Sequence, residues 1–180
     1  MATYNFADVV GSTIAFDPTL DILNFAAGSA NRLLLSPDGL DIVVSLDGQG
    51  VRLANVAFVQ LLSSNFAFAS GDIVSLGTAG NDSLTGSGGN DFIDIHLGGV
   101  DSVAAGDGDD RIVALGSLTA TDRVDGGPGA HDELRLQGTV GTVVFTPTTV
   151  TGVEIIVFEV VQAPASSLRM PLSRRPLDRH

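Results

Sequence analysis

Four consecutive stretches of the chain share one pattern: GTAGNDSLT (77–85), GSGGNDFID (86–94), HLGGVDSVA (96–104) and AGDGDDRIV (105–113). In each stretch glycines come shortly before an Asp. Looser copies follow in TATDRVD (119–125) and GGPGAHDELRL (126–136), and SGDIVSL (70–76) is an earlier echo. Successive Asp residues of the six copies are 9, 10, 9, 12 and 10 residues apart. This regular spacing identifies an internal repeat, the sequence signature of a solenoid.

An aliphatic residue stands two positions after the Asp of every copy. These residues are Leu84, Ile93, Val103, Ile112, Val124 and Leu134. Three residues with an apolar centre make a minimal strand that turns one side chain toward a core. Glycine permits positive φ, so the glycine-rich residues before the Asp can form a tight turn. Two copies therefore predict one coil, turn–strand–turn–strand, of a flattened parallel solenoid.

Turns one coil apart should lie on the same edge of such a solenoid. The stacked pairs predicted by the spacing are Asp82 with Asp101, Asp91 with Asp110, Asp101 with Asp122, and Asp110 with Asp132. Two carboxylates held close together repel each other, and a calcium ion between them turns this repulsion into a net electrostatic attraction. Calcium takes six to eight oxygen ligands, backbone carbonyls among them. We therefore expect Ca²⁺ as the cofactor.

The pattern closely resembles GGxGxDxUx, the RTX (repeats-in-toxin) or hemolysin-type calcium-binding repeat of bacterial type I secretion substrates. The resemblance implies a parallel β-roll in which position six supplies a carboxylate and positions one to four supply carbonyls. The metal ligands that it implies are Gly77, Ala79, Gly80, Asp82, Gly86, Gly88, Gly89, Asp91, Asp101, Asp107, Gly108, Asp110, Gly127, Gly129 and Asp132. Asp122 lacks glycines at the motif positions. Asp94, Asp109 and Asp125 are expected to carry surface charge.

Two other interpretations of residues 71–136 remain. The segment could be a flexible acidic linker, although a linker gives no reason for phased aliphatic residues. It could also be a solenoid without calcium, in which the Asp residues only cap turns.

The rest of the chain predicts an all-β fold. Residues 1–70 alternate short apolar blocks with turn signals, and Asp47–Gly48 is a hairpin signal. We expect an N-terminal antiparallel β module (1–70), a calcium-binding β-roll (71–138), a C-terminal β extension or cap (139–162) and a disordered basic tail (163–180).

Composition narrows the function classes. The 180 residues include 21 acidic residues, 18 of them Asp, and the net charge is −12, which argues against nucleic-acid binding. The sequence has no Lys and no Cys, which excludes lysine chemistry, disulfides and thiolate metal sites. HExxH and GxSxG motifs are also absent. We therefore expect no enzyme.

We expect neither a secretory signal peptide at the N-terminus nor a membrane span, because no apolar run is long enough. The resemblance implies a secreted, extracellular protein whose partners are calcium ions and a possible type I secretion apparatus. The sequence specifies no oligomeric state. The alternative is a fragment of a larger secreted RTX enzyme or adhesin in which the roll only stabilises the protein or serves its secretion.

Overall fold

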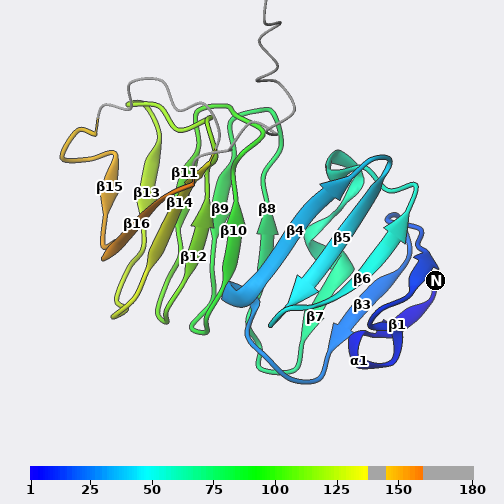
Figure 1. The fold of residues 1–180 in the computed structure, drawn as a ribbon. Helices are drawn as coiled ribbons and strands as arrows, with labels where there is room; N and C mark the ends of the chain where they lie inside the picture. The colour runs from blue at the N-terminus through cyan, green and yellow to red at the C-terminus, as the bar shows by residue number, and fades with distance from the viewer. Residues whose placement is uncertain (138–144, 160–180) are drawn as a thin grey trace, which may run out of the picture.

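The structure is a computed structural model that describes residues 1–137 and 145–159, and its strands form a front module and a roll (Figure 1). The expected basic tail (163–180) and residues 139–144 and 160–162 of the expected C-terminal extension lie outside these residues.

The front module contains two small sheets. The first is parallel, with the order β1 (Thr3–Asn5), β3 (Ile22–Phe25) and β7 (Phe66–Phe68). The second is mixed, with the order β2 (Thr13–Ala15), β6 (Gln49–Ala54), β5 (Asp41–Leu46) and β4 (Leu33–Asp38). Short helical segments connect the strands: α1 (Phe6–Val9), η1 (Ala30–Arg32), η2 (Phe58–Gln60) and η3 (Ser63–Asn65).

The antiparallel prediction for this module holds only for the β4–β5–β6 meander. Asp47 and Gly48 have φ of 53° and 78°, as the predicted hairpin turn between β5 and β6 requires. The pairs β1–β3, β3–β7 and β2–β6 are parallel. Their strands are joined by long connections rather than tight turns, and such connections allow parallel pairing. The front module is therefore mixed.

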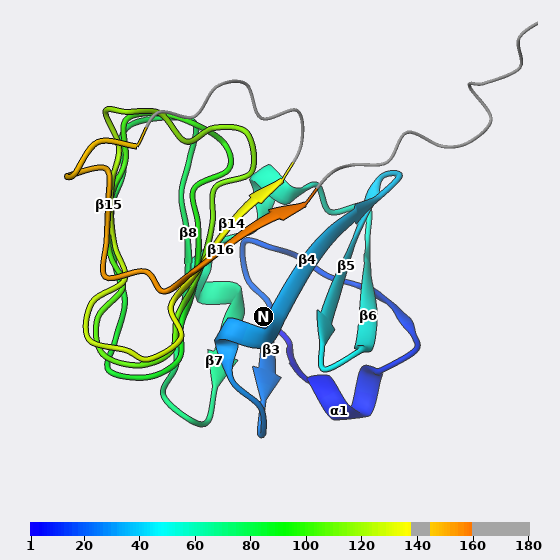
Figure 2. The ribbon, with the colours of Figure 1, turned by 60° about the vertical axis from the view of Figure 1, so that its left-hand side comes forward.

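The second part is a parallel β-roll, as predicted. One sheet has the order β8 (Val74–Leu76), β10 (Phe92–Asp94), β12 (Arg111–Val113), β14 (Glu133–Gln137) and β16 (Ile155–Glu159). The other has the order β9 (Ser83–Thr85), β11 (Ser102–Ala104), β13 (Arg123–Asp125) and β15 (Val150–Thr151). In Figure 2 successive coils overlie one another as a flattened ring.

The repeated aliphatic residues form two columns inside the roll. Register places Leu84, Val103, Val124 and Val150 in one column, and Ile93, Ile112, Leu134 and Ile156 in the other. Ile93, Ile112 and Leu134 are completely buried. The alternation of strand and turn thus gives each coil one aliphatic side chain for each sheet.

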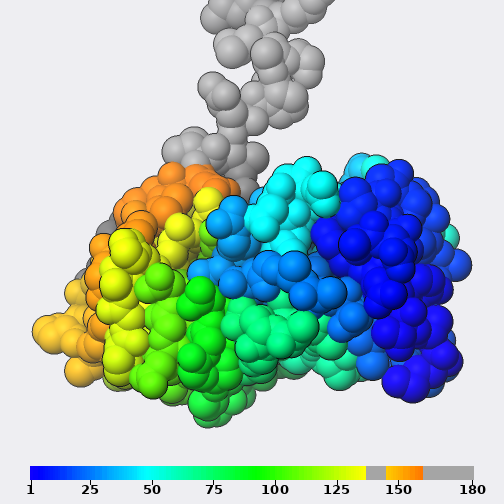
Figure 3. Space-filling model, turned by 90° about the horizontal axis from the view of Figure 1, so that it is seen from below, coloured from blue at the N-terminus to red at the C-terminus, as the bar shows by residue number. Residues whose placement is uncertain are grey.

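The front module packs against the first coils of the roll, and the two parts form one continuous surface in Figure 3. Within β10, Phe92 belongs to the apolar core of the front module, whereas Ile93 belongs to the core of the roll. Hydrogen bonds reinforce this contact. The N–H of Asn31 donates to the carbonyl of Asn90 (3.0 Å), and the N–H of Ala30 donates to Asp72 Oδ2 (3.1 Å).

Truncation of a column residue should destabilise the roll. We expect Ile112→Ala to lower the free energy of unfolding by about 2–5 kcal/mol, because it leaves a cavity between Ile93 and Leu134. Urea unfolding with calcium present measures this change. The control Val100→Ala, at a residue that is 46% exposed, should stay within about 0.5 kcal/mol of the unmutated protein. Equal losses in both variants would contradict the column.

Candidate calcium-binding turns

The roll aligns the repeated Asp residues in two rows, one on each edge. Strand register and hydrogen bonds bring together all four stacked pairs that the spacing predicts. In each pair the backbone N–H of the first Asp donates to Oδ1 of the second. The N–O distances are 3.0 Å for Asp82 to Asp101, and 2.8 Å for Asp91 to Asp110, for Asp101 to Asp122 and for Asp110 to Asp132.

These rows hold unusually buried carboxylates. Asp91, Asp101, Asp110, Asp122 and Asp132 are each no more than 4% exposed, and Asp82 is half-buried. Burial of an ionised carboxylate is costly unless a counter-charge or hydrogen bonds offset the lost hydration. The arrangement therefore places negative charge where hydrogen bonds, a proton or a cation must replace the lost hydration.

Burial and like charge change the acidity of three of these groups. Burial raises the pKa of Asp110 to about 7, and the carboxylates of Asp91 and Asp132 add to the rise. Burial also raises the pKa of Asp132, with Glu154 contributing, and that of Asp101, with Asp82 and Asp122 contributing. These carboxyl groups are poised to exchange a proton for a cation.

Two carboxylate oxygens are left without any hydrogen-bond partner. Asp110 Oδ2 and Asp132 Oδ2 are both buried, and neither accepts a hydrogen bond. Buried polar atoms in folded proteins are nearly always satisfied, so an unpartnered pair in one row needs a cause. A bound cation would satisfy both atoms.

The turn next to Asp132 forms a cradle of oxygen atoms. A Cβ atom added to Gly129 would lie 2.2 Å from the carbonyl oxygen of Gly108, 2.5 Å from Asp132 Oδ2 and 2.9 Å from Asp132 Oδ1. Three oxygens from two adjacent coils thus converge on a space that only glycine leaves open. Hard oxygen donors of this kind suit calcium.

Backbone carbonyls must supply most of the ligands. Among residues 1–137 and 145–159, no three His, Cys, Asp or Glu side chains converge on one metal position. The candidate carbonyl donors all lie in the turns that precede a strand of the roll. They are Gly77, Ala79 and Gly80 before β9, Gly86, Gly88 and Gly89 before β10, Asp107 and Gly108 before β12, and Gly127 and Gly129 before β14.

The rows also contain acidic residues that the repeat does not single out as ligands. Asp122, from the copy without motif glycines, is 1% exposed and lies in register with Asp101. Glu154 Oε2 accepts the N–H of Asp132 (3.0 Å), so it continues the row. Asp72 accepts hydrogen bonds from the N–H groups of Ala30 and Asn90. Glu154 could have been predicted from the sequence, because Asp132 and Glu154 are 22 residues apart, as are Asp110 and Asp132.

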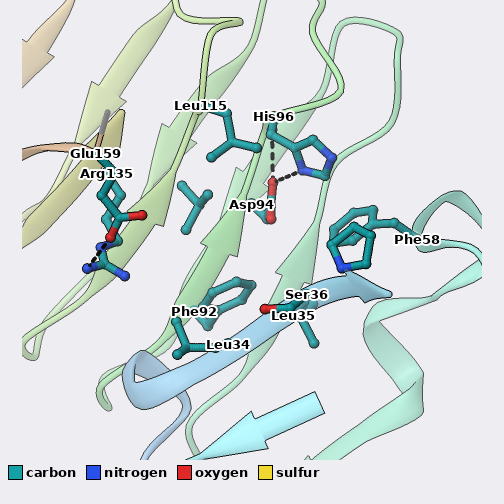
Figure 4. A pocket seen from close by; sticks show the side chains of 12 residues that line it. Leu34, Leu35, Ser36, Phe58, Phe92, Asp94, His96, Leu115, Arg135 and Glu159 are labelled. Atoms are coloured by element: carbon teal, nitrogen blue, oxygen red, sulfur yellow. Dashed lines mark hydrogen bonds and ion pairs between the residues drawn. The ribbon is translucent and has the colours of Figure 1, made fainter. Parts of the chain in front are cut away.

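The prediction of surface charge is wrong for Asp94, which is 4% exposed. The front module covers the outer face of β10, a contact that the repeat alone does not reveal. Asp94 Oδ1 lies 2.6 Å from His96 Nδ1, on the wall of a cavity of about 280 Å³ between β4 and the roll (Figure 4). The side chain of Asp109 is 42% exposed and Asp125 is exposed, as expected.

Asp110 should give the metal-free protein a pH-dependent stability. Its pKa is about 7 in the folded chain and near 3.8 when unfolded, so the folded state keeps a proton that the unfolded chain releases. This contribution to stability is present below pH 3.8 and is lost as the pH rises to about 7. Relative to the unmutated protein, Asp110→Asn should gain more than about 1 kcal/mol across this range. Urea midpoints of chelator-stripped protein test this, and parallel pH profiles for the two proteins would contradict it.

Comparison with known proteins gives one match. The family model of the RTX calcium-binding nonapeptide repeat (4 copies) matches residues 74–94 and 97–117. No curated protein and no solved structure matches the chain. No helix in the described part of the chain is long and apolar enough to cross a membrane.

Proposed function

We propose, from the premise that this chain carries RTX calcium-binding nonapeptide repeats, that calcium drives the folding of its β-roll. RTX repeats bind Ca²⁺, so calcium binding follows from the family. The further step is that repulsion between its own carboxylates keeps the roll from folding fully until calcium neutralises them.

One observation carries this proposal: Asp110 and Asp132 are stacked and buried, and each has an unpartnered Oδ2. In the absence of a cation, folding must desolvate both groups and bring their charges together. The unfolded chain avoids both costs. An ion that binds only the folded roll therefore shifts the equilibrium toward folding by mass action.

The proposed ligands follow the position-by-position pattern of the family. Carboxylates come from Asp82, Asp91, Asp101, Asp110 and Asp132. Carbonyl oxygens come from Gly77, Ala79, Gly80, Gly86, Gly88, Gly89, Asp107, Gly108, Gly127 and Gly129. Ca²⁺ would contribute positive charge and a flexible shell of oxygen ligands, while these residues hold the turns of adjacent coils together.

We also propose that the protein is secreted and acts as a structural calcium module rather than an enzyme. RTX repeats are typical of secreted bacterial proteins and are generally structural. Intracellular calcium is low and extracellular modules bind with Kd of about 10⁻⁴–10⁻³ M, so the roll would fold only outside the cell. Delayed folding would keep the chain competent for a type I exporter.

Calcium should convert the roll from a partly folded state to a fully β-rich one. We expect millimolar calcium to increase the β-type circular dichroism and to raise Tm, because each ion at a tenfold excess over Kd adds about 1.4 kcal/mol. Equimolar magnesium is the control, since Mg²⁺ requires shorter and near-octahedral coordination. Identical spectra and Tm values with chelator and with calcium would overturn the proposal.

A further inference from the structure

Five turns of the roll form two groups, which differ in whether a Thr or Ser of the turn donates hydrogen bonds to the Asp carboxylate. In the turn 77–82, Thr78 stands four residues before Asp82. The N–H of Thr78 donates to Asp82 Oδ2 (2.7 Å), and its hydroxyl lies 3.1 Å from both carboxylate oxygens. The same hydroxyl accepts the N–H of Gly80 (3.1 Å). The turn therefore provides hydrogen-bond donors to its own carboxylate without a metal ion.

The turn 86–91 is built in the same way. The N–H of Ser87 donates to Asp91 Oδ2, and the Ser87 hydroxyl donates to Asp91 Oδ1 (2.9 Å). The N–H of Ile73 also donates to Asp91 Oδ1 (2.7 Å). Thr119 satisfies Asp122 similarly, with its N–H 2.5 Å and its hydroxyl 3.0 Å from Oδ2.

The turns 105–110 and 126–132 contain no such cap. The residue four before Asp110 is Gly106, which has no hydroxyl and whose φ of +106° turns the backbone differently. The residue four before Asp132 is Pro128, which has neither a hydroxyl nor an N–H. Asp110 is 1% exposed and Asp132 is fully buried, and Oδ2 of each remains unpartnered.

We propose that calcium binds first between turns 105–110 and 126–132, and that turns 77–82 and 86–91, capped by Thr78 and Ser87, bind it at least about tenfold more weakly. This inference rests on the proposed function. An ion at Asp82 or Asp91 must displace hydrogen bonds to a charged group, and each such bond corresponds to about tenfold in affinity. An ion at Asp110 and Asp132 displaces none on Oδ2.

This order of calcium binding has a structural consequence, because two of the three capped turns, 77–82 and 86–91, belong to the coils beside the front module. Asp72 and Asn90 accept hydrogen bonds from Ala30 and Asn31 there. The first coils thus form with internal caps and a protein neighbour. The turns 105–110 and 126–132 contain no such cap on Oδ2 of Asp110 and Asp132, so these two carboxylates depend on the ion. The pair that binds first includes Asp132, which lies beyond the residues matched by the family model.

Calorimetric titration of the full chain with CaCl₂ tests the order. We expect Asp110→Asn and Asp132→Asn each to lower the calcium affinity of the tightest binding phase by about tenfold or more, because both turns contribute ligands to that site. Asp91→Asn should instead act on a weaker phase and lower the Tm of the metal-free protein. Asp8→Asn, at an exposed residue of the front module, is the matched control and should leave every phase unchanged.

A gain-of-binding variant keeps the test decisive if an Asn variant fails to fold. Ser87→Gly removes the cap from Asp91 and restores glycine at the motif position, so it should add about one ion to the tight phase. Ser36→Gly in β4 is its control. The inference is overturned if Ser87→Gly leaves the number of tightly bound ions unchanged, or if Asp91→Asn removes the tight phase as fully as Asp110→Asn. If the titration of the unmutated protein with CaCl₂ shows no heat of binding, the proposed function itself is refuted.

Discussion

Electrostatic repulsion between stacked, buried Asp carboxylates is the constraint on which the roll depends. Each coil needs its Asp at the turn, because the Oδ1 of that Asp accepts the backbone N–H of the preceding coil and fixes the stacking distance. The same arrangement repeats the charge along each row and removes it from water. Apolar columns supply the favourable free energy of burial. Under the proposed function, the charge rows decide whether that free energy is sufficient at a given calcium concentration. Hydroxyl caps offset the cost of burial at Asp82, Asp91 and Asp122, and we propose that calcium offsets it at Asp110 and Asp132.

The sequence predicts the part of the fold that depends on short-range periodicity. The Asp spacing and the aliphatic residue two positions later suffice for the coil, the pairing of Asp91 with Asp110, and the Ile93–Ile112–Leu134 column. The parallel pairing of β1 with β3 was not predictable from local turn signals, because long connections bring these strands together. The burial of Asp94 depends on tertiary structure, because β4 forms part of the wall of the cavity that Asp94 lines. The roles of Thr78 and Ser87 were visible as residue types, but their significance required the hydrogen-bond geometry.

The front module contributes a boundary for the roll. A solenoid exposes the apolar interior and the unpaired strand edge of its terminal coil unless something covers them. At the first coil, the core of the front module extends to Val74 and Phe92. The contrast at the other end is plain. Ile156, the last residue of its column, is 41% exposed, and Phe158 in the same strand is 57% exposed. The roll therefore has two chemically different ends, one packed and one open among the described residues.

The unequal lengths of the coils show where such a scaffold tolerates variation. Hydrogen-bonded Asp pairs are separated by 19 residues in the first coils and by 21 and then 22 in later ones, yet the N–O distances remain between 2.8 and 3.0 Å. The additional residues fall between the end of one strand and the next Asp, as in the stretch after Val113. The perimeter of a coil can thus lengthen without a shift in strand register. For protein engineering, the stretch after Val113 is a natural position at which to graft a foreign loop.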